Sequence, residues 1–438
     1  MIITKPVASR VLSTLVLGGL LIAPSQNWAA SYVVDRFDDA PGADTCSIFA
    51  ANDCSLRGAV LKANQESGQD DLFLMPGTYT LTVAGRNEDL AATGDLDILF
   101  DMTLQPLGPG TTVTINGGDI DRILDIRDTA AVTIKRLVLT NGSVPGSPGG
   151  AIQIKYNASL RLENSIIDDN IAKWGGGICN FGTLDIVASK IEGNDASDQG
   201  GGIYNQRAMT LTDSTVGLFN SAAKGGGLYN SGNPATLVRS TFWANSASED
   251  GGGVFNSNGM SMENCSFFLN SAPSGSGGGI FSEHWLLLHS VTLTGNTSDG
   301  TSNGSAIYGL SGDLMITDSI IQGDCVPGPD TVSYGGNLES PGNTCGLTHD
   351  DDLVNVADPM LGTADYHGGL TVTWSLEPGS PAIEAGGVSC IGRDQRNRKR
   401  PIDGDGDHNP LCDSGAYEYD PAEIFVDSFE SGGAGAWS

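Results

Sequence analysis

The sequence predicts an all-β chain that folds as a single-stranded right-handed parallel β-helix, a solenoid with an N-terminal cap and a disulfide-containing C-terminal cap. Three observations predict this class. A glycine-rich block recurs about every 25 residues, apolar residues alternate within short segments between the blocks, and the composition combines 61 glycines with only 17% charged residues. Glycine permits the tight turns that thin, repeated coils need, and it disfavours helices.

Residues 1–30 predict a secretory signal peptide. Lys5 and Arg10 precede an apolar stretch at 11–23, and small residues such as Ala29 follow it. This stretch is shorter than the roughly 20 apolar residues that span a bilayer, and no later segment approaches that length. We therefore expect an exported chain that has no transmembrane segment once the signal is removed.

The formal net charge of −30 limits the partners of the chain. Nucleic acid and anionic membranes would bring like charges together, so neither is an expected partner. A divalent cation or a neutral or cationic glycan is compatible with this charge. The sequence leaves the oligomeric state open.

Eight cysteines in an exported chain suggest disulfides. Six of them form local pairs outside the repeats, although sequence alone leaves the connectivity open: Cys46 with Cys54, Cys325 with Cys345, and Cys390 with Cys412. Cys179 and Cys265 lie inside the repeats, at positions that other copies fill with aromatic residues and serine. They are therefore expected to be packing residues and not catalytic thiols.

Residues 31–110 are expected to form the N-terminal cap and the first strands. Residues 54–64 predict a short amphipathic helix, which suits the open end of a solenoid because terminal repeats must cover the exposed core. The segment Cys54-Ser55-Leu56-Arg57-Gly58-Ala59-Val60, followed by Lys62-Ala63-Asn64, resembles the CSLREA-type N-terminal domain. Members of that family usually have glutamate where this chain has Gly58.

Residues 111–325 are expected to form the β-helix repeats. The glycine block recurs at steps of 25 or 26 residues, at Gly175–Asn180, Gly200–Asn205, Gly225–Asn230, Gly251–Asn256 and Gly277–Ser282. Period-two alternation between the blocks indicates strands, and stacking of the coils would align like residues. One predicted apolar column is Ile134, Leu162, Ile186, Leu211, Leu237, Met262, Leu287 and Ile316. The other is Leu139, Ile167, Ile191, Val216, Phe242, Phe267, Thr292 and Ile321.

Polar residues also recur in register. A serine column contains Ser165, Ser189, Ser214, Ser240, Ser290 and Ser319, with Leu137 and Cys265 as exceptions. One asparagine column contains Asn170, Asn194, Asn220, Asn245, Asn270 and Asn296, and another contains Asn180, Asn205, Asn230 and Asn256. Asparagine suits coil corners, and stacked amides can hydrogen-bond along the axis. A residue repeated in every coil is predicted to be architectural, because a ligand site needs only one copy.

The repeats at about 110–325 resemble those of polymorphic outer-membrane proteins and related bacterial β-helix passengers. Residues 326–423 are expected to form further coils and the C-terminal cap. They contain Gly379–Gly386, Asp394–Arg396 and Cys412–Glu418, which are similar to the C-terminal region of choice-of-anchor Q proteins. These resemblances imply a bacterial protein that is secreted or on the cell surface, and they supply no catalytic residues. The tail at 424–438 is either a sorting signal or a disordered end.

Two charged segments near the C-terminus are candidate binding sites. Alternating oxygen donors suit a structural calcium ion or a solvated acidic turn, and they are Asp403, Asp405, Asp407 and Asn409, with Asp413 and Glu418 as additional candidates. A basic cluster either pairs with neighbouring carboxylates or binds an acidic sugar, and it consists of Arg393, Arg396, Arg398, Lys399 and Arg400.

Catalytic candidates come from one outward column, predicted as Arg136, Asn164, Ala188, Asp213, Arg239, Asn264, His289 and Asp318. Within it, Asp213 with Arg239, and His289 with Asp318, are the only polar combinations. A surface ion pair between adjacent coils is the structural alternative for Asp213 and Arg239. Neither combination supplies the paired acids of a glycosidase or the acid cluster beside a base of a calcium-dependent lyase.

Two classes of function remain. The favoured one is a noncatalytic extracellular or cell-surface protein, adhesin-like or glycan-binding. The alternative is a polysaccharide lyase or glycoside hydrolase, because a fold does not determine function. An acid cluster in a groove would favour the enzyme, whereas a smooth face would favour binding.

Overall fold

The computed structural model describes residues 29–47, 51–65, 67–86, 88–300, 303–387 and 390–422. The predicted signal peptide lies almost entirely outside the described residues, and the predicted tail lies wholly outside them. Both therefore stay predictions. In the part of the chain that the structure describes, no helix is long and apolar enough to cross a membrane.

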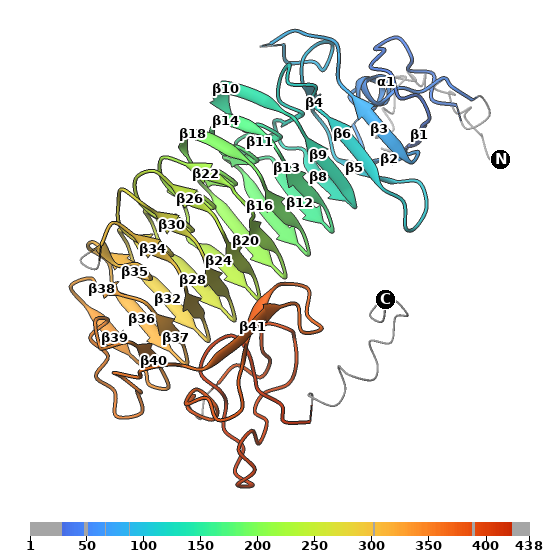
Figure 1. Ribbon diagram of the computed structural model, residues 1–438. Helices are drawn as coiled ribbons and strands as arrows, with labels where there is room; N and C mark the ends of the chain where they lie inside the picture. The colour runs from blue at the N-terminus through green and yellow to red at the C-terminus, as the bar shows by residue number, and fades with distance from the viewer. Residues whose placement is uncertain are drawn as a thin grey trace, which may run out of the picture.

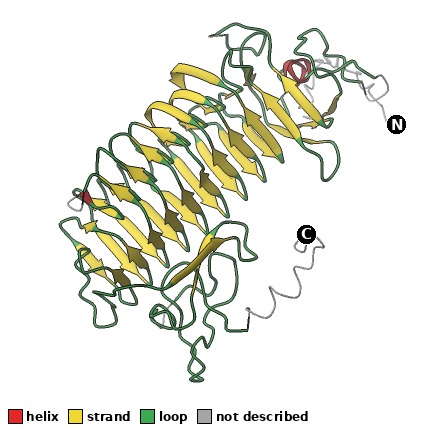
Figure 2. Cartoon of the chain, viewed as in Figure 1, coloured by secondary structure: helices red, strands yellow, loops and turns green. Residues whose placement is uncertain are grey.

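The chain winds into a parallel β-helix, so the predicted fold class is confirmed (Figures 1 and 2). Each complete coil contributes one strand to each of four parallel sheets, which we call sheets I to IV in the order in which a coil passes through them. Strands that return at a fixed period pair with their equivalents in the next coil, and this pairing satisfies backbone groups that a single coil would leave open.

Sheets I and II form two adjacent sides of the solenoid. Sheet I contains β1 (Ser31–Val34), β2 (Asp70–Leu74), β5 (Met102–Pro106), β8 (Ala131–Lys135), β12 (Ser159–Glu163), β16 (Thr183–Val187), β20 (Ala208–Thr212), β24 (Ala235–Val238), β28 (Met260–Glu263), β32 (Leu286–His289), β36 (Leu314–Thr317) and β39 (Thr331–Ser333). Sheet II contains β3 (Gly77–Thr80), β6 (Val113–Asn116), β9 (Leu137–Thr140), β13 (Ile166–Asp168), β17 (Lys190–Glu192), β21 (Thr215–Gly217), β25 (Thr241–Trp243), β29 (Ser266–Phe268), β33 (Thr292–Thr294), β37 (Ile320–Gln322) and β40 (Leu338–Ser340).

Sheets III and IV complete the coil. Sheet III contains β10 (Ser143–Pro148), β14 (Ile171–Trp174), β18 (Asp195–Gln199), β22 (Ser221–Ala222), β26 (Ser246–Ala247), β30 (Ser271–Ala272) and β34 (Thr297–Ser298). Sheet IV contains β4 (Leu96–Ile98), β7 (Leu124–Ile126), β11 (Ile152–Ile154), β15 (Ile178–Asn180), β19 (Ile203–Asn205), β23 (Leu228–Asn230), β27 (Val254–Asn256), β31 (Ile280–Ser282), β35 (Ile307–Gly309) and β38 (Cys325–Val326). A separate antiparallel pair consists of β41 (Leu361–Asp365) and β42 (Thr373–Leu376).

The apolar columns stack as one buried core. Leu162, Ile186, Leu211 and Leu237 pair in successive layers of sheet I, and all four are buried. The predicted columns are wrong in one coil, where Leu288 replaces Leu287 and Leu293 replaces Thr292.

The cause of this one-residue error is local. Three consecutive leucines hide the inward phase of β32, and Ser290 imitates the serine column. In the structure Val291 fills that column, because its N–H is bonded to Ser319 Oγ at 3.0 Å. Ser290 instead takes the left-handed corner position, with φ 54°. A single slip therefore displaces four predicted members of the coil, Leu287, His289, Ser290 and Thr292.

The two asparagine columns form buried amide ladders. In the first, each side-chain N–H₂ donates to the next Oδ1 at 2.9–3.0 Å, from Asn170 to Asn296. The second runs from Asn180 to Asn256 and ends on the hydroxyl of Ser282. The same amides bond backbone groups at the corners. The side-chain oxygens and N–H₂ groups of these ladders are bonded within the protein, which confirms the architectural interpretation.

A helix closes the N-terminal end, as predicted. Helix α1 (Leu56–Ala63) begins at Ser55, whose hydroxyl accepts a bond from Gly58 N–H at 2.9 Å. A Cβ on Gly58 would lie 2.1 Å from the carbonyl oxygen of Ala43. This contact explains why glycine occupies the position at which the resembled family has glutamate.

The three predicted disulfides are present: Cys46–Cys54, Cys325–Cys345 and Cys390–Cys412. The first lies beside α1, the second closes the last coil, and the third lies in the C-terminal cap. Cys179 and Cys265 are buried free thiols, as expected for packing residues. Burial raises the pKa of Cys265 to about 12 and that of Cys179 further.

The C-terminal cap covers more than the last coil. After β40 the chain folds back beside the stack, where β41 and β42 lie along sheet II (Figure 1). Gln395 is central to this contact, since its amide bonds Thr241 at 2.9 Å and Ser266 at 2.6 Å on neighbouring coils. The cap therefore also shields the outer face of sheet II.

Candidate functional site

The predicted catalytic pair Asp213 and Arg239 is an ion pair between adjacent coils. The guanidinium donates to both carboxylate oxygens, at 2.7 and 2.9 Å. The carbonyl of Arg239 also accepts a bond from Thr371 of the C-terminal cap. Both charged groups already satisfy each other beside a docked segment, so the geometry is that of a structural contact.

His289 does not belong to the outward column in which it was predicted, because the one-residue slip places Ser290 there. Its Nε2 nevertheless lies 3.5 Å from Asp318 Oδ2. Asp318 is buried and holds the C-terminal cap, since Oδ1 accepts from Gly387 N–H and the carbonyl accepts from Gly415 N–H. Glu263 is the direct cross-strand partner of His289 on the preceding coil, but among the described residues only Asp318 has a carboxylate oxygen within ion-pair distance of its ring.

The predicted calcium loop is an exposed turn. Asp403 accepts backbone bonds from Gly406 and His408, and Asp405 and Asp407 each accept one from the residue two positions later. Asn409 lies at the end of this turn. Asp403 and Asp405 have oxygens within 4.8 Å of those of Glu384, a residue outside the predicted set. Calcium at this loop stays a prediction.

Two of the five members of the basic cluster, Arg396 and Arg400, pair with neighbouring carboxylates, which was the structural alternative for the cluster. Arg396 forms a buried ion pair with Asp394 at 2.6 Å, and Arg400 forms one with Glu418 at 3.2 Å. Arg396 also lies 3.7 Å from the ring centre of Tyr417. These groups hold the C-terminal cap together, and Glu418 is thereby committed to Arg400.

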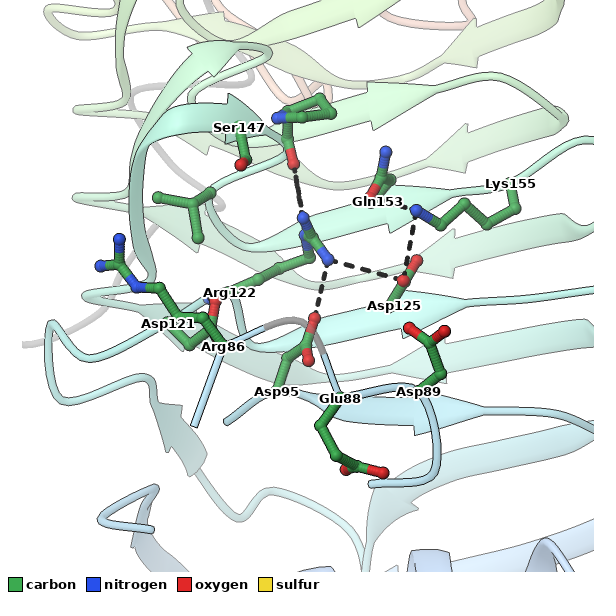
Figure 3. Close-up of a pocket in the computed structure, with 12 residues that line it drawn as sticks. Arg86, Glu88, Asp89, Asp95, Asp121, Arg122, Asp125, Ser147, Gln153 and Lys155 are labelled. Carbon is green, nitrogen blue, oxygen red and sulfur yellow. Dashed lines mark hydrogen bonds and ion pairs between the residues drawn. The ribbon is translucent and has the colours of Figure 1, made fainter. Parts of the chain in front are cut away.

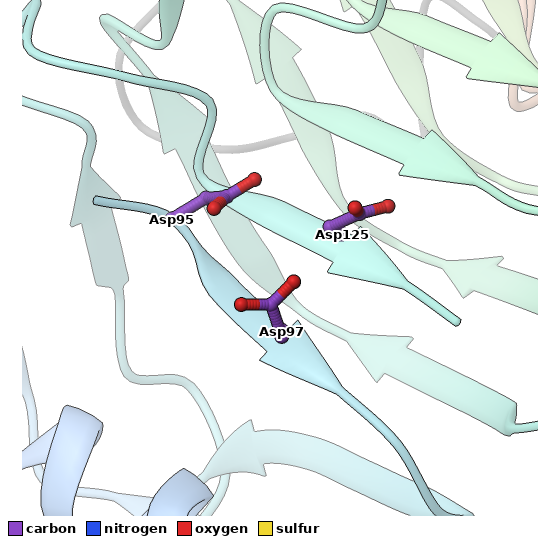
Figure 4. Close-up of side chains that lie close together, drawn as sticks. All are labelled: Asp95, Asp97 and Asp125. Atoms are coloured by element: carbon purple, nitrogen blue, oxygen red, sulfur yellow. The ribbon is translucent and has the colours of Figure 1, made fainter. Parts of the chain in front are cut away.

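An acid cluster that sequence analysis missed lies at the N-terminal end of sheet IV. Asp97 and Asp125 are the central, outward residues of β4 and β7, and they are direct partners in the parallel register. Asp95 precedes β4, and oxygens of the three carboxylates lie within 4.8 Å of one another (Figure 4). All three residues are at most 5% exposed.

Asp95 and Asp125 line a polar pocket of about 220 Å³ that opens to the surface, and Asp97 lies directly behind them. Figure 3 shows Arg122 and Lys155 reaching toward Asp95 and Asp125 from the next elements. Arg122 lies 2.7 Å from Asp95 and also bonds the carbonyls of Pro148 and Gly149. Lys155 Nζ lies 3.3 Å from Asp125. We call this cavity the acidic pocket.

Burial dominates the electrostatics of the acidic pocket. The pKa of Asp95 is raised to about 7. Burial is the largest cause, the neighbouring aspartates act in the same direction, and the attraction of Arg122 opposes them. Burial also raises the pKa of Asp97 to about 6, although the backbone N–H of Ala91 opposes the shift. Two like charges directly opposite on adjacent strands repel, so this site needs protons or cations.

Residues of the N-terminal cap position the loop and strand that carry the acid cluster. Arg57 is fully buried, pairs with Asp39 at 2.6 Å, and donates to the carbonyls of Ala91 and Gly94. It therefore holds the loop that carries Asp95. In the same way, Asn64 at the end of α1 bonds the backbone of Asp97 and Leu99 on either side of the end of β4.

A second feature is a row of shallow cavities at the corner between sheets IV and I, which we call the corner groove. Three cavities of about 340, 330 and 160 Å³ adjoin one another, because neighbours share Thr129 and Asn157. Lys155 also borders the acidic pocket. Each cavity lies between the turns of successive coils, so the groove follows the solenoid axis.

Tyr156 is the exposed aromatic residue of the corner groove. It is 52% exposed, stacks on Phe181 at 5.8 Å between ring centres, and lies under the guanidinium of Arg207 at 5.2 Å. Its hydroxyl contacts Gln206 at 3.1 Å. The ring is thus held in place while one side remains open to solvent.

Comparison with protein-family models, with curated proteins and with solved structures found no match for this chain. The class that the geometry defines is a parallel β-helix with stacked polar ladders. The sequence signal for the acidic pocket was the repeated triplet Leu-Asp-Ile at 96–98 and 124–126. Extending the column of Cys179 and Tyr204 toward the N-terminus reaches Gln153, Asp125 and Asp97.

Proposed function

We propose that this chain is a noncatalytic secreted or cell-surface protein that binds a linear glycan in the corner groove. The observation that carries the proposal is the groove itself, a continuous row of cavities parallel to the axis with the exposed ring of Tyr156 within it. Ligand sites combine apolar and aromatic surface with a few placed polar groups. The exposed basic side chain of Arg207, which lies over the Tyr156 ring, extends the range of ligands to acidic glycans.

Three disulfides support the extracellular part of the proposal, because such bonds persist in oxidising compartments. The CSLREA-like segment, the repeat resemblance and the choice-of-anchor Q-like segment support a bacterial surface or secreted location. An adhesin-like role would use the same groove, since a rigid solenoid can present it at a distance from the cell.

The enzymatic alternative is a polysaccharide lyase or glycoside hydrolase that uses the acidic pocket. A glycosidase needs two carboxyl groups about 5 to 9.5 Å apart, one on each side of the scissile bond. The three aspartates have oxygens closer than this and are buried. The bases that lie nearest to these acids are themselves paired: Lys155 with Asp125 and with Gln153 at 2.7 Å, and Arg122 with Asp95 at 2.7 Å. These contacts favour binding without turnover.

The test is a panel of immobilised acidic and neutral polysaccharides, including polygalacturonate, alginate and xylan, measured by biolayer interferometry with and without calcium. The Tyr156→Ala variant is expected to bind about tenfold more weakly, since it removes an anchoring ring. The matched control is Tyr334→Ala, which changes a tyrosine that is 60% exposed and lies outside the groove. Equal affinities for wild type and Tyr156→Ala would contradict this location.

The same samples distinguish binding from catalysis. Wild-type protein incubated with each bound polysaccharide is expected to release neither new reducing ends nor unsaturated uronates. Release of either product that is lost in the Asp125→Asn variant would replace the binding proposal by the enzymatic one.

A further inference from the structure

We propose that Asp95, Asp97 and Asp125 bind one hard divalent cation, for which Ca²⁺ is the best match. The proposal concerns the acidic pocket alone and does not depend on a glycan in the corner groove. It begins from a structural conflict. Asp97 and Asp125 are buried, direct cross-strand partners, and carboxylates in that arrangement destabilise a sheet unless something between them carries positive charge.

The pocket contains acceptors without donors. Oδ1 of Asp125 is buried and accepts no hydrogen bond from any residue that the structure describes. The same is true of Oδ2 of Asp121, a residue outside the cluster of three that lines the same pocket and is 5% exposed. Buried oxygens are nearly always paired, so two unpaired ones in one pocket indicate a ligand that supplies positive charge.

The neighbouring bases compensate these carboxylates only in part, although Arg127 Nη1 lies between the two cross-strand partners, 3.0 Å from Asp97 and 3.8 Å from Asp125. Arg122 is held by Asp95 and by two backbone carbonyls, and Arg127 pairs with Asp89 at the rim and with Asp97 at 3.0 Å. The cations nearest to Asp125 approach only its Oδ2, at 3.3 to 3.8 Å. The opposite oxygen, Oδ1, therefore remains available to a ligand.

The charge count agrees with one divalent ion. The pocket and its immediate wall contain six carboxylates, on Glu88, Asp89, Asp95, Asp97, Asp121 and Asp125. They contain four basic side chains, on Arg86, Arg122, Arg127 and Lys155. The difference is two negative charges, and the three aspartates of the cluster are buried, where an uncompensated charge is costly.

The ligand atoms select the class of cation. Among the described residues that line the pocket there is no histidine or cysteine, so soft transition metals have no preferred ligand. Carboxylate oxygens from a strand pair and a loop suit Ca²⁺, which accepts irregular oxygen geometry, better than Mg²⁺, which demands an octahedron. Water entering through the open side would complete the shell.

The experiment is calcium titration of the full-length protein by isothermal calorimetry, after removal of divalent ions with a chelator. Wild type is expected to bind Ca²⁺, and Asp125→Asn is expected to weaken that event at least about tenfold while preserving side-chain shape. The matched control is Asp405→Asn in the exposed loop, which would remove an event at that loop and leave the event at the pocket. Absence of calcium binding in wild type, or an unchanged isotherm for Asp125→Asn, would overturn the proposal.

A second measurement does not depend on the folding of a variant. Wild-type crystals soaked in Sr²⁺, an anomalous scatterer that stands in for Ca²⁺, are expected to give an anomalous peak among the three aspartates. Fully occupied density elsewhere with none at this position would refute the site even if Asp125→Asn does not fold. If wild-type crystals show no Sr²⁺ peak at the three aspartates but the protein still binds a glycan, the corner-groove proposal stands and only the cation site is refuted.

Discussion

Individual side chains show how closely charge is tied to the stacking. In sheet II, Asp168 is the last residue of β13 and the direct partner of Glu192 on the next coil, and Asp169 follows it in the chain. The pKa of Asp168 is raised to about 6. Burial is the largest cause, and repulsion from Asp169 and Glu192 acts in the same direction. An exact repeat that places like residues over like therefore also places like charges together, and the fold tolerates this where solvent is near.

The Asp168→Asn variant tests this repulsion. Because the folded state raises this pKa, protonation of Asp168 stabilises the fold fully below about pH 4, and the contribution is lost as pH rises through 6. We expect the variant to match wild type at pH 4 and to be more stable at pH 8. The difference should be at most about 1 kcal/mol, because solvent screens this half-exposed group. Urea unfolding at both pH values measures it, and a gain of equal size at pH 4 would contradict the charge explanation.

At the scale of the element, the glycine blocks are close backbone contacts between coils. A Cβ on Gly201 would lie 2.3 Å from the carbonyl oxygen of Gly226 in the next coil and 2.4 Å from that of Ser221. The block recurs because each copy meets the next copy at the same corner. Its function is steric, and this explains why no phosphate or other ligand is needed to account for it.

Gly201→Ala is therefore expected to destabilise the chain by about 3 kcal/mol, since rigid backbone atoms on both sides must move. Gly146→Ala is the matched control, because a Cβ there meets nothing within 4 Å. That variant should change stability by less than about 0.5 kcal/mol or increase it slightly. Thermal unfolding followed by circular dichroism compares the two, and similar melting temperatures for both variants would show that the corner contact is not tight.

At the scale of the whole molecule, two long-range contacts decide which surfaces remain available. The C-terminal cap covers part of sheet II through Gln395 and through Trp374, whose ring lies 6.1 Å from that of Phe268. The corner groove between sheets IV and I lies at another corner of the coil and carries an exposed ring. The molecule therefore has one covered side and one side with an open groove.

Replacing Gln395 by leucine should loosen the cap without unfolding the solenoid. Three hydroxyl partners, on Thr241, Ser266 and Thr371, would lose their bonds to the amide, at a cost of about 3 kcal/mol. Hydrogen exchange is expected to increase in β25 and β29 and in the cap, and to stay low in sheet IV. Gln105→Leu, on a half-buried position of sheet I, is the control. Uniformly faster exchange in every sheet would show that cap and solenoid unfold as one unit.

The fold was predictable from sequence because equivalent positions of successive coils carry similar residues. A column such as Leu162, Ile186 and Leu211 is visible as a period, and the period forces parallel stacking. The prediction was wrong only where the local signal was ambiguous. Three consecutive leucines before His289 fit two phases, and the contacts of Val291 with the next coil select one.

The sequence by itself determined the coil and its buried ladders, because these repeat. It also predicted the helical cap and plausible local cysteine pairs, whose connectivity the structure then showed. Only the tertiary structure decided where charge converges. Arg57 bonds the carbonyl of Asp95 and so holds a nonrepeating loop beside sheet IV, while Gly387 of the cap bonds Asp318 across a separation of 69 residues. Contacts of this kind do not repeat from coil to coil, so they leave no periodic pattern in the sequence. They depend on how the chain packs in three dimensions.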